Sequence, residues 1–125
     1  MSFTEEIQVN LNRAESSLGA AQVLIEAHFY NDAVSRAYYS AFYGATALLL
    51  SKEISVRSHS GLLQAIGLNF VKTGLLEKQF GRDLNRLAEL RSVGDYGELK
   101  HIRLSEAVQA VETAAAFLKE VHSIL

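Results

Sequence analysis

Proline is absent from all 125 residues, and apolar residues recur at helical spacing along nearly the whole chain. The pattern is clearest near the N-terminus, where spacings of four and three alternate through Ile7, Leu11, Ala14, Leu18, Ala21 and Ile25. Such spacing places the apolar side chains on one stripe that packs against antiparallel neighbours. No segment shows the sustained alternation of apolar and polar residues, bounded by turn signals, that is typical of strands. The sequence therefore predicts an all-α fold.

Capping and turn residues divide the chain into five expected helices. Asn31 is a suitable N-cap for a second helix over about 32–52, and Ser105 is one for the last helix. A loop over 53–58 separates the second helix from the third, and the fourth helix is expected over about 75–95. Because the connections are short, we expect an antiparallel four- or five-helix up-and-down bundle.

The bulk properties are those of one intracellular domain. A chain of 125 residues suffices for a single core, so residues 1–125 are expected to form one domain. The net charge of −2 does not indicate a nucleic-acid-binding surface, although a local basic patch is compatible with it. The first ten residues do not resemble a signal peptide, and the apolar run 41–50 is too short to span a bilayer. We expect a cytoplasmic protein without a membrane partner.

The second helix has large or apolar residues on two opposite faces. This pattern fits the central helix of a bundle, and it also fits a homodimer interface. Arg36, Tyr39 and Tyr43 share one of these faces. Aromatic rings beside arginines can stack bases and bind phosphates, whereas the alternative role of these residues is packing.

The fourth helix carries two charges on its apolar stripe. Arg91 and Asp95 fall among the positions that continue Phe80, Leu84, Leu87 and Ala88. Burying a lone charge is costly, so the pair forms either a structural ion pair or part of a site. In a site, Arg91 would bind a phosphate with its planar fork, Asp95 would orient Arg91, and the adjacent Tyr96 would add a hydroxyl.

A third candidate lies at the start of the third helix. Arg57 and His59 flank Ser58 there, so backbone N–H groups and two cationic side chains can meet an anion. The alternative is a serine-capped helix with an interfacial histidine. The remaining histidines show no metal-ligand spacing, and cysteine is absent. No metal or cofactor is expected.

Three motifs together resemble one family. The run Asp32–Phe42 (DAVSRAYYSAF) is similar to the second helix of small prokaryotic HEPN proteins (higher eukaryotes and prokaryotes nucleotide-binding). Ser58-His59 and the run RSVGDYG, which starts at Arg91, match the same branch in order and spacing. The resemblance implies a helical bundle that forms a homodimer and associates with a minimal nucleotidyltransferase, often as a toxin–antitoxin pair.

The resemblance also bears on catalysis. In many HEPN proteins an Arg-x4–6-His motif from each of two subunits cleaves RNA without a metal. Arg91 matches the family arginine, but Tyr96 stands where the histidine would be, and His101 lies outside the window. The leading interpretation is binding of a nucleotide or RNA by Arg91, helped by Tyr96 and His59, in partnership with a nucleotidyltransferase.

Two other functions stay open. One is a metal-independent ribonuclease toxin, in which Arg91 stabilises the phosphorane charge and His59 or Tyr96 transfers protons. The other is a structural dimerisation module in which Arg91 and Asp95 only lock the bundle. In relatives of the family, a tyrosine near the motif receives nucleotidyl groups from the partner enzyme. Tyr96 lies close to the corresponding position in this sequence. The residue at the same distance from Arg91 as the relatives' tyrosine is from their arginine is Glu98.

Overall fold

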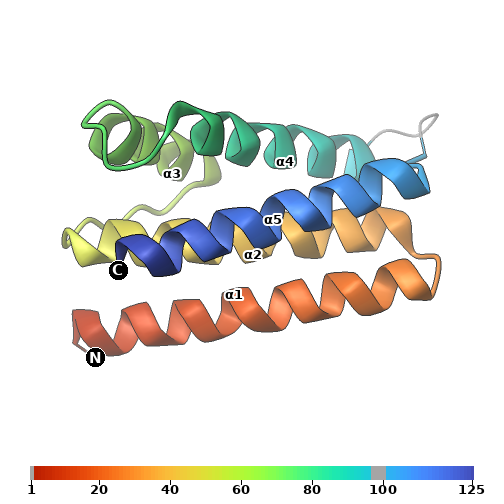
Figure 1. The fold of residues 1–125 in the computed structure, drawn as a ribbon, viewed down its shortest axis with the longest axis horizontal. Coiled ribbons are helices and arrows are strands. Elements are labelled where there is room, and N and C mark those ends of the chain that lie inside the picture. Colours follow the sequence, from red (N-terminus) through yellow and green to blue (C-terminus); the bar gives the residue numbers. More distant parts are fainter. Residues whose placement is uncertain (1, 97–100) are drawn as a thin grey trace.

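The fold is an antiparallel bundle of helices (Figure 1). A computed structural model describes residues 2–96 and 101–125, except for the side chains of Asp95 and Tyr96. Its elements are α1 (Phe3–Glu26), α2 (Tyr30–Ser51), α3 (His59–Ile66), the π-helical turn η1 (Gly67–Val71), α4 (Lys78–Tyr96) and α5 (Leu104–Ile124). The described residues contain no strand. The predicted all-α up-and-down bundle is thus confirmed, and none of the described helices is long and apolar enough to cross a membrane.

Helix α2 is the centre of the bundle. It packs against α1, α5 and α4, and it also contacts α3. Small residues let its neighbours approach closely: a Cβ added at Gly44 would lie 3.3 Å from the Leu118 side chain of α5. The hydroxyl of Ser40 is buried between α1 and α2, and it donates a hydrogen bond of 2.8 Å to the Ala14 carbonyl of α1. One chain therefore covers most of α2, while Tyr39, Phe42 and Tyr43 stay half-buried.

The N-cap predicted for α2 is wrong. The chain reverses at His28, whose φ is +68°, and α2 begins at Tyr30 with Phe29 as its N-cap. Asn31 therefore lies inside the first turn, where its side chain makes tertiary bonds instead. Its amide nitrogen donates to the Gly94 carbonyl at 3.1 Å, and its oxygen accepts from the Ile102 backbone nitrogen at 3.1 Å. Asn31 thus joins α2 to the last turn of α4 and to the segment before α5.

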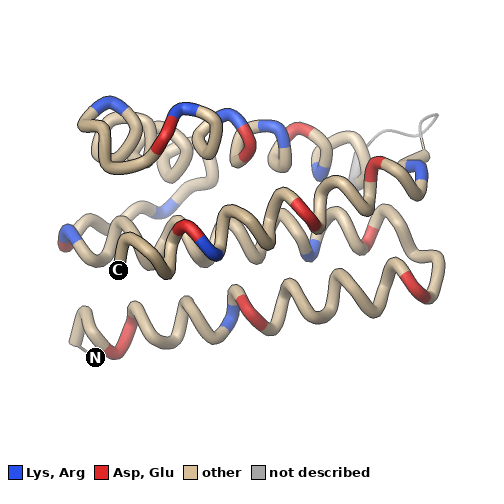
Figure 2. Tube along the Cα trace, in the orientation of Figure 1, with Lys and Arg blue, Asp and Glu red and all other residues tan. Residues whose placement is uncertain are grey.

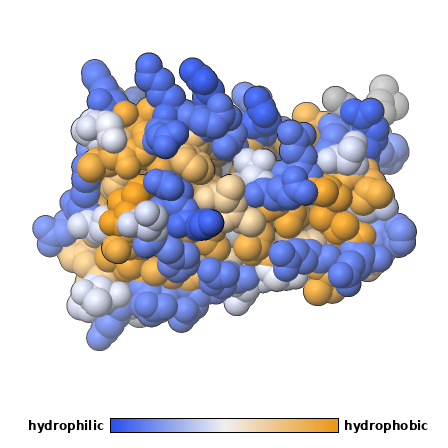
Figure 3. Space-filling model, in the orientation of Figure 1, coloured by the Kyte–Doolittle hydropathy of each residue, from blue (hydrophilic) through white to orange (hydrophobic). Residues whose placement is uncertain are grey.

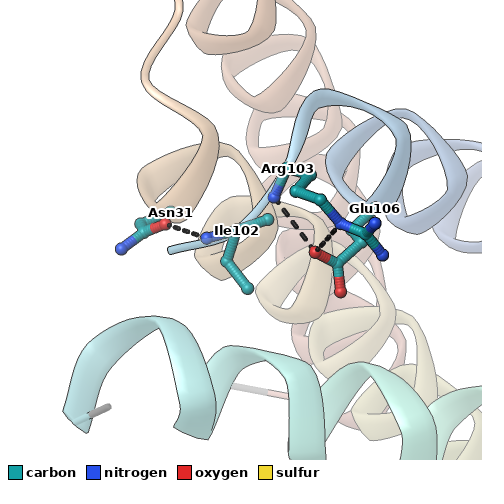
Figure 4. Close-up of polar contacts among 4 residues, drawn as sticks. All are labelled: Asn31, Ile102, Arg103 and Glu106. Atoms are coloured by element: carbon teal, nitrogen blue, oxygen red, sulfur yellow. Dashed lines mark hydrogen bonds and ion pairs between the residues drawn. The ribbon is translucent and has the colours of Figure 1, made fainter. Parts of the chain in front are cut away.

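The N-cap predicted for α5 is also displaced. The helix begins at Leu104, one residue before Ser105, and Arg103 is the N-cap. The Glu106 carboxylate accepts hydrogen bonds from the backbone nitrogen and the Nε of Arg103, as Figure 4 shows next to the Asn31 contact. The first of these bonds satisfies the backbone N–H of the N-cap residue, so the Glu106 carboxylate rather than a serine hydroxyl ties down the start of α5.

Charges are mixed on the visible outer surface of the bundle. Figure 2 shows Lys and Arg interspersed with Asp and Glu along α4, and Figure 3 shows that hydrophilic side chains line this edge of the molecule. Apolar side chains come to the surface along α5 and over the region of α3 in the same view (Figure 3). The acidic net charge is therefore spread out, so a local cluster of arginines can still dominate one face.

Candidate functional site

The site is built on Tyr38, a core residue with a polar end. Tyr38 lies on α2 and its side chain is only 1% exposed. Its hydroxyl is hydrogen-bonded to Nδ1 of His59, the first residue of α3, at 2.7 Å. Burial raises the pKa of Tyr38 to about 12, although the positive charge of Arg91 opposes this shift. The hydroxyl therefore remains protonated at neutral pH.

His59 sits against a group of aromatic rings. Its ring is stacked on Tyr38 with centroids 5.6 Å apart, lies 4.8 Å from the ring of Phe42 and meets Tyr39 edge-on. Ser58 caps α3 by accepting a hydrogen bond from the Gly61 nitrogen, which fixes the start of this helix. Desolvation and the charge of Arg91 lower the pKa of His59 below its usual value. The exposed imidazole is therefore mostly neutral at pH 7.

Arg91 reaches the same rings from α4. Its guanidinium carbon lies 5.5 Å from the ring centroid of Tyr38 and 5.2 Å from that of Tyr39. Both distances are within the range of cation–π contacts. The unusual charge on the apolar stripe of the fourth helix is thus directed at the aromatic face of α2. Stacking of this kind holds the planar guanidinium in one orientation.

Arg36 extends the arrangement along α2. Its guanidinium carbon lies 4.9 Å from the Tyr39 ring centroid, so Tyr39 contacts two arginines. We call Arg36, Tyr38, Tyr39, His59 and Arg91 the Arg91 cluster. Its members come from three helices, and they combine two permanent positive charges, a neutral imidazole and a half-buried tyrosine ring. This set of groups is suited to a ligand with a phosphate and a planar base.

The other predicted site residues are not part of these contacts. Arg57 is exposed, and among the described residues no polar or ring contact joins it to the Arg91 cluster. The side chains of Asp95 and Tyr96 lie outside the described residues, so their roles stay predictions. The described residues also hold no group of three His, Asp or Glu side chains placed to bind a metal ion.

Sequence reasoning missed three residues that shape the site. Tyr38 and Phe42 lie on the face of α2 whose helical periodicity predicts packing, and Asn31 has the side chain of an N-cap. The signal for Tyr38 was present, because a tyrosine on a buried face needs a partner for its hydroxyl. Asn31 gave no such signal, since its two partners lie more than 60 residues away in the sequence.

The pKa of His59 tests whether Arg91 and His59 share one electrostatic site. We expect NMR titration of the His59 ring to give a pKa below 6.5 in the wild type, because desolvation and Arg91 both disfavour the imidazolium. In Arg91→Gln the pKa should rise, since one of these two causes is removed. Arg82→Gln, an exposed arginine on the same helix, is the matched control. Equal pKa values in the wild type and Arg91→Gln would show that the two side chains do not interact.

Asn31→Ala tests the junction that holds the end of α4. The substitution removes one donor and one acceptor, so we expect the free energy of unfolding to fall by about 1–2 kcal/mol. Urea denaturation followed by circular dichroism measures this change. Asn85→Ala is the control, because Asn85 is exposed and bonds only within its own helix. A loss no larger than in the control would mean that the junction contributes nothing to stability.

Comparison with known proteins gives a consistent family. A family model described as the HEPN domain matches residues 7–124. The chain is 38% identical to "Putative toxin MJ0605" of Methanocaldococcus jannaschii over 97% of this chain and 90% of that protein. It is 38% identical to a UPF0332 protein of Thermotoga maritima over 90% of this chain and 86% of that protein. It is 35% identical to "Putative toxin MJ0142" of M. jannaschii over 98% of this chain and 84% of that protein.

Proposed function

This chain belongs to the HEPN domain family, and from that premise we propose that its Arg91 cluster binds a nucleotide or single-stranded RNA. One observation carries the proposal. The Arg91 guanidinium lies over the rings of Tyr38 and Tyr39, beside a histidine that is hydrogen-bonded to Tyr38. A phosphate group and an unstacked base are the two chemical features that these side chains recognise together.

Arg91 and Tyr39 have different parts in binding. The Arg91 guanidinium donates a fork of hydrogen bonds to two phosphate oxygens, and its contact with the rings pre-orients that fork. Tyr39 is half-buried, so the open part of its ring is a platform for a base. Only single strands and loops have bases free to stack in this way. Duplex RNA is therefore excluded from the base platform.

A competition experiment tests the proposal. A labelled single-stranded RNA is titrated with the protein in EDTA and low salt, and binding is followed by fluorescence anisotropy. We expect saturable binding that is displaced by unlabelled single-stranded RNA and, at higher concentration, by a nucleoside monophosphate. A duplex of the same sequence should compete much more weakly. Absence of binding, or equal competition by the duplex, would contradict the proposal.

We further propose that the protein acts in a toxin–antitoxin-type system with a minimal nucleotidyltransferase as its partner. The names of the two M. jannaschii relatives support the first part, and the resemblance of the motifs supports the second. Induced expression should arrest growth, and Arg91→Ala should relieve the arrest while Arg82→Ala should not. Mass spectrometry after co-expression with a nucleotidyltransferase tests whether Tyr96 is modified, and unmodified Tyr96 beside an active partner would remove that role.

We also propose that the protein is a homodimer with α4 and Arg91 close to the two-fold axis. The half-buried Phe42 on α2 supports this, because the RNA-binding proposal assigns no base to it and a second chain can cover it. Light scattering at micromolar concentration should give twice the mass of one chain. A monomeric mass would contradict the dimer without affecting RNA binding by one chain.

The second candidate function is metal-independent RNA cleavage, and the bond between His59 and Tyr38 favours it. In the tautomer whose Nδ1–H donates to Tyr38, Nε2 keeps a lone pair and can accept the proton of a ribose 2′-hydroxyl. The 2′-oxygen then attacks phosphorus, Arg91 stabilises the negative phosphorane, and the P–O5′ bond breaks as solvent protonates the leaving oxygen. Because the family histidine is replaced, we still expect little cleavage by the isolated protein. Robust cleavage in EDTA that is lost in both Arg91→Ala and His59→Asn would make this the main function.

A further inference from the structure

A second cationic feature lies next to the Arg91 cluster, between α1 and α2. It is an open groove of about 390 Å³, and its lining includes Asn12, Arg13, Ser16, Arg36 and Tyr43. Arg36 belongs to both places, because its guanidinium also contacts Tyr39. The groove is therefore continuous with the Arg91 cluster through one side chain.

The two places are also linked by aromatic rings. The rings of Tyr39 and Tyr43 lie one helical turn apart on α2, with centroids 6.0 Å apart and planes inclined at 36°. Arg13 of α1 places its guanidinium carbon 5.8 Å from the Tyr43 ring centroid. The pattern of an arginine against a tyrosine is thus repeated from the Arg91 cluster into the groove.

The groove arginines are not neutralised by nearby carboxylates. Among the side chains that the structure describes, neither Arg13 nor Arg36 forms an ion pair. Each guanidinium uses its face for a ring, so its N–H donors remain at the edge. The groove also offers the amide of Asn12 and the hydroxyl of Ser16 as neutral donors. This chemistry matches a polyanion with bases between its charges.

We propose that the α1–α2 groove is the second half of a path for single-stranded RNA that begins at Arg91. The strand would pass over Tyr39, place successive phosphates on Arg36 and Arg13, and stack a base on Tyr43. The proposal rests on RNA binding by the Arg91 cluster and adds the direction that the strand takes from it. It predicts that substitutions in the groove lower the affinity for long RNA more than the affinity for short RNA, because only a longer strand reaches the groove.

A larger groove between η1 and α4 is the alternative path and supplies the control. It measures about 650 Å³, and its lining includes Lys78, Arg82, Arg86 and Glu89 but no aromatic residue. It can attract phosphates, yet it has no ring on which a base can stack. Removing two of its arginines changes the net charge as much as removing Arg13 and Arg36.

The experiment compares two probes, a uridine dinucleotide and a single-stranded oligouridylate of about ten nucleotides, which falls within the range of known single-strand site sizes. In the Arg13→Gln/Arg36→Gln double variant, we expect affinity for the long probe to fall about tenfold. The slope of log affinity against log salt should become shallower by about 1.4, or about 0.7 for each lost phosphate contact. Affinity for the dinucleotide should change little in Arg13→Gln, because Arg13 lies outside the Arg91 cluster. Arg36→Gln should weaken both probes, because Arg36 belongs to the cluster as well as to the groove. Tyr43→Leu should also weaken the long probe about tenfold, with a smaller change in salt slope.

The controls separate the possible outcomes. Arg13→Gln alone alters an exposed side chain and guards against misfolding, and circular dichroism should show unchanged helicity in every variant. Equal losses in the groove variant and in Arg82→Gln/Arg86→Gln would overturn the path, as would equal losses for the two probes. If Arg91→Gln weakens both probes while the groove variants weaken neither, the groove proposal fails and the proposed function stands. If the groove variants weaken the long probe while Arg91→Gln weakens neither, the groove binds RNA without the Arg91 cluster, and both the proposed function and the path from Arg91 fail.

Discussion

Replacing Arg91 by glutamine is expected to weaken binding of single-stranded RNA by roughly 30- to 150-fold, or about 2–3 kcal/mol. Arg91 is the only member of the Arg91 cluster that comes from α4, and its guanidinium contacts both tyrosine rings. Glutamine removes the positive charge and the fork of donors at once. The loss should therefore exceed that of any single exposed arginine, whose ion pairs contribute at most about 1 kcal/mol. Anisotropy titrations at one fixed salt concentration measure the change.

Two further variants define the cause of this loss. Arg91→Lys keeps the charge and removes the planar fork, so it should recover only part of the affinity. Arg82→Gln removes a charge from the exposed face of the same helix and should lower affinity less than threefold, within about 0.6 kcal/mol. If Arg82→Gln weakens binding as much as Arg91→Gln, the interaction is a general attraction to positive charge.

Phe117→Ala is expected to lower the free energy of unfolding by about 3–5 kcal/mol. The Phe117 side chain is fully buried on α5, and its ring meets that of Phe80 edge-on at 6.4 Å. It also approaches α2, because a Cβ added at Gly44 would lie 3.8 Å from its ring. Truncation therefore leaves a cavity between three helices. A loss of this size is a large fraction of the stability of a domain of this length.

The matched control is Phe29→Ala, which makes the same substitution at a side chain that is 56% exposed. We expect a change within about 0.5 kcal/mol there, since an exposed ring loses little on truncation. Urea denaturation gives both values with a common slope. Similar losses at the two positions would show that Phe117 is not buried in the core of the protein in solution.

The fold was largely predictable because it is specified by a periodic pattern of apolar residues. Apolar residues at spacings of three and four specify amphipathic helices, and the absence of proline leaves those helices uninterrupted. The ends of the helices were less predictable. Asn31 has a good capping side chain, yet its amide is used by Gly94 and Ile102, which only the packed bundle brings near. A local preference was overridden by tertiary hydrogen bonds.

The site was predictable in its parts and not as a whole. Arg91, Tyr39, Arg36 and His59 were each identified from a helical face or a helix start. Their meeting depends on how α3 and α4 pack against α2, which no spacing within one helix reveals. Tyr38 joins them from the buried face of α2, where helical periodicity predicts packing alone. A tyrosine on a buried face signals that its hydroxyl needs a partner, but the sequence does not identify that partner, because His59 comes from another helix.

Photo-crosslinking tests the central proposal most directly. A single-stranded RNA that contains 4-thiouridine is irradiated with the wild-type protein, and the modified peptides are identified by mass spectrometry. Binding at the Arg91 cluster predicts crosslinks at Tyr39 and His59, and Arg91→Gln should abolish them. Crosslinks confined to the outer face of α4, around Lys78, Arg82 and Arg86, would contradict it.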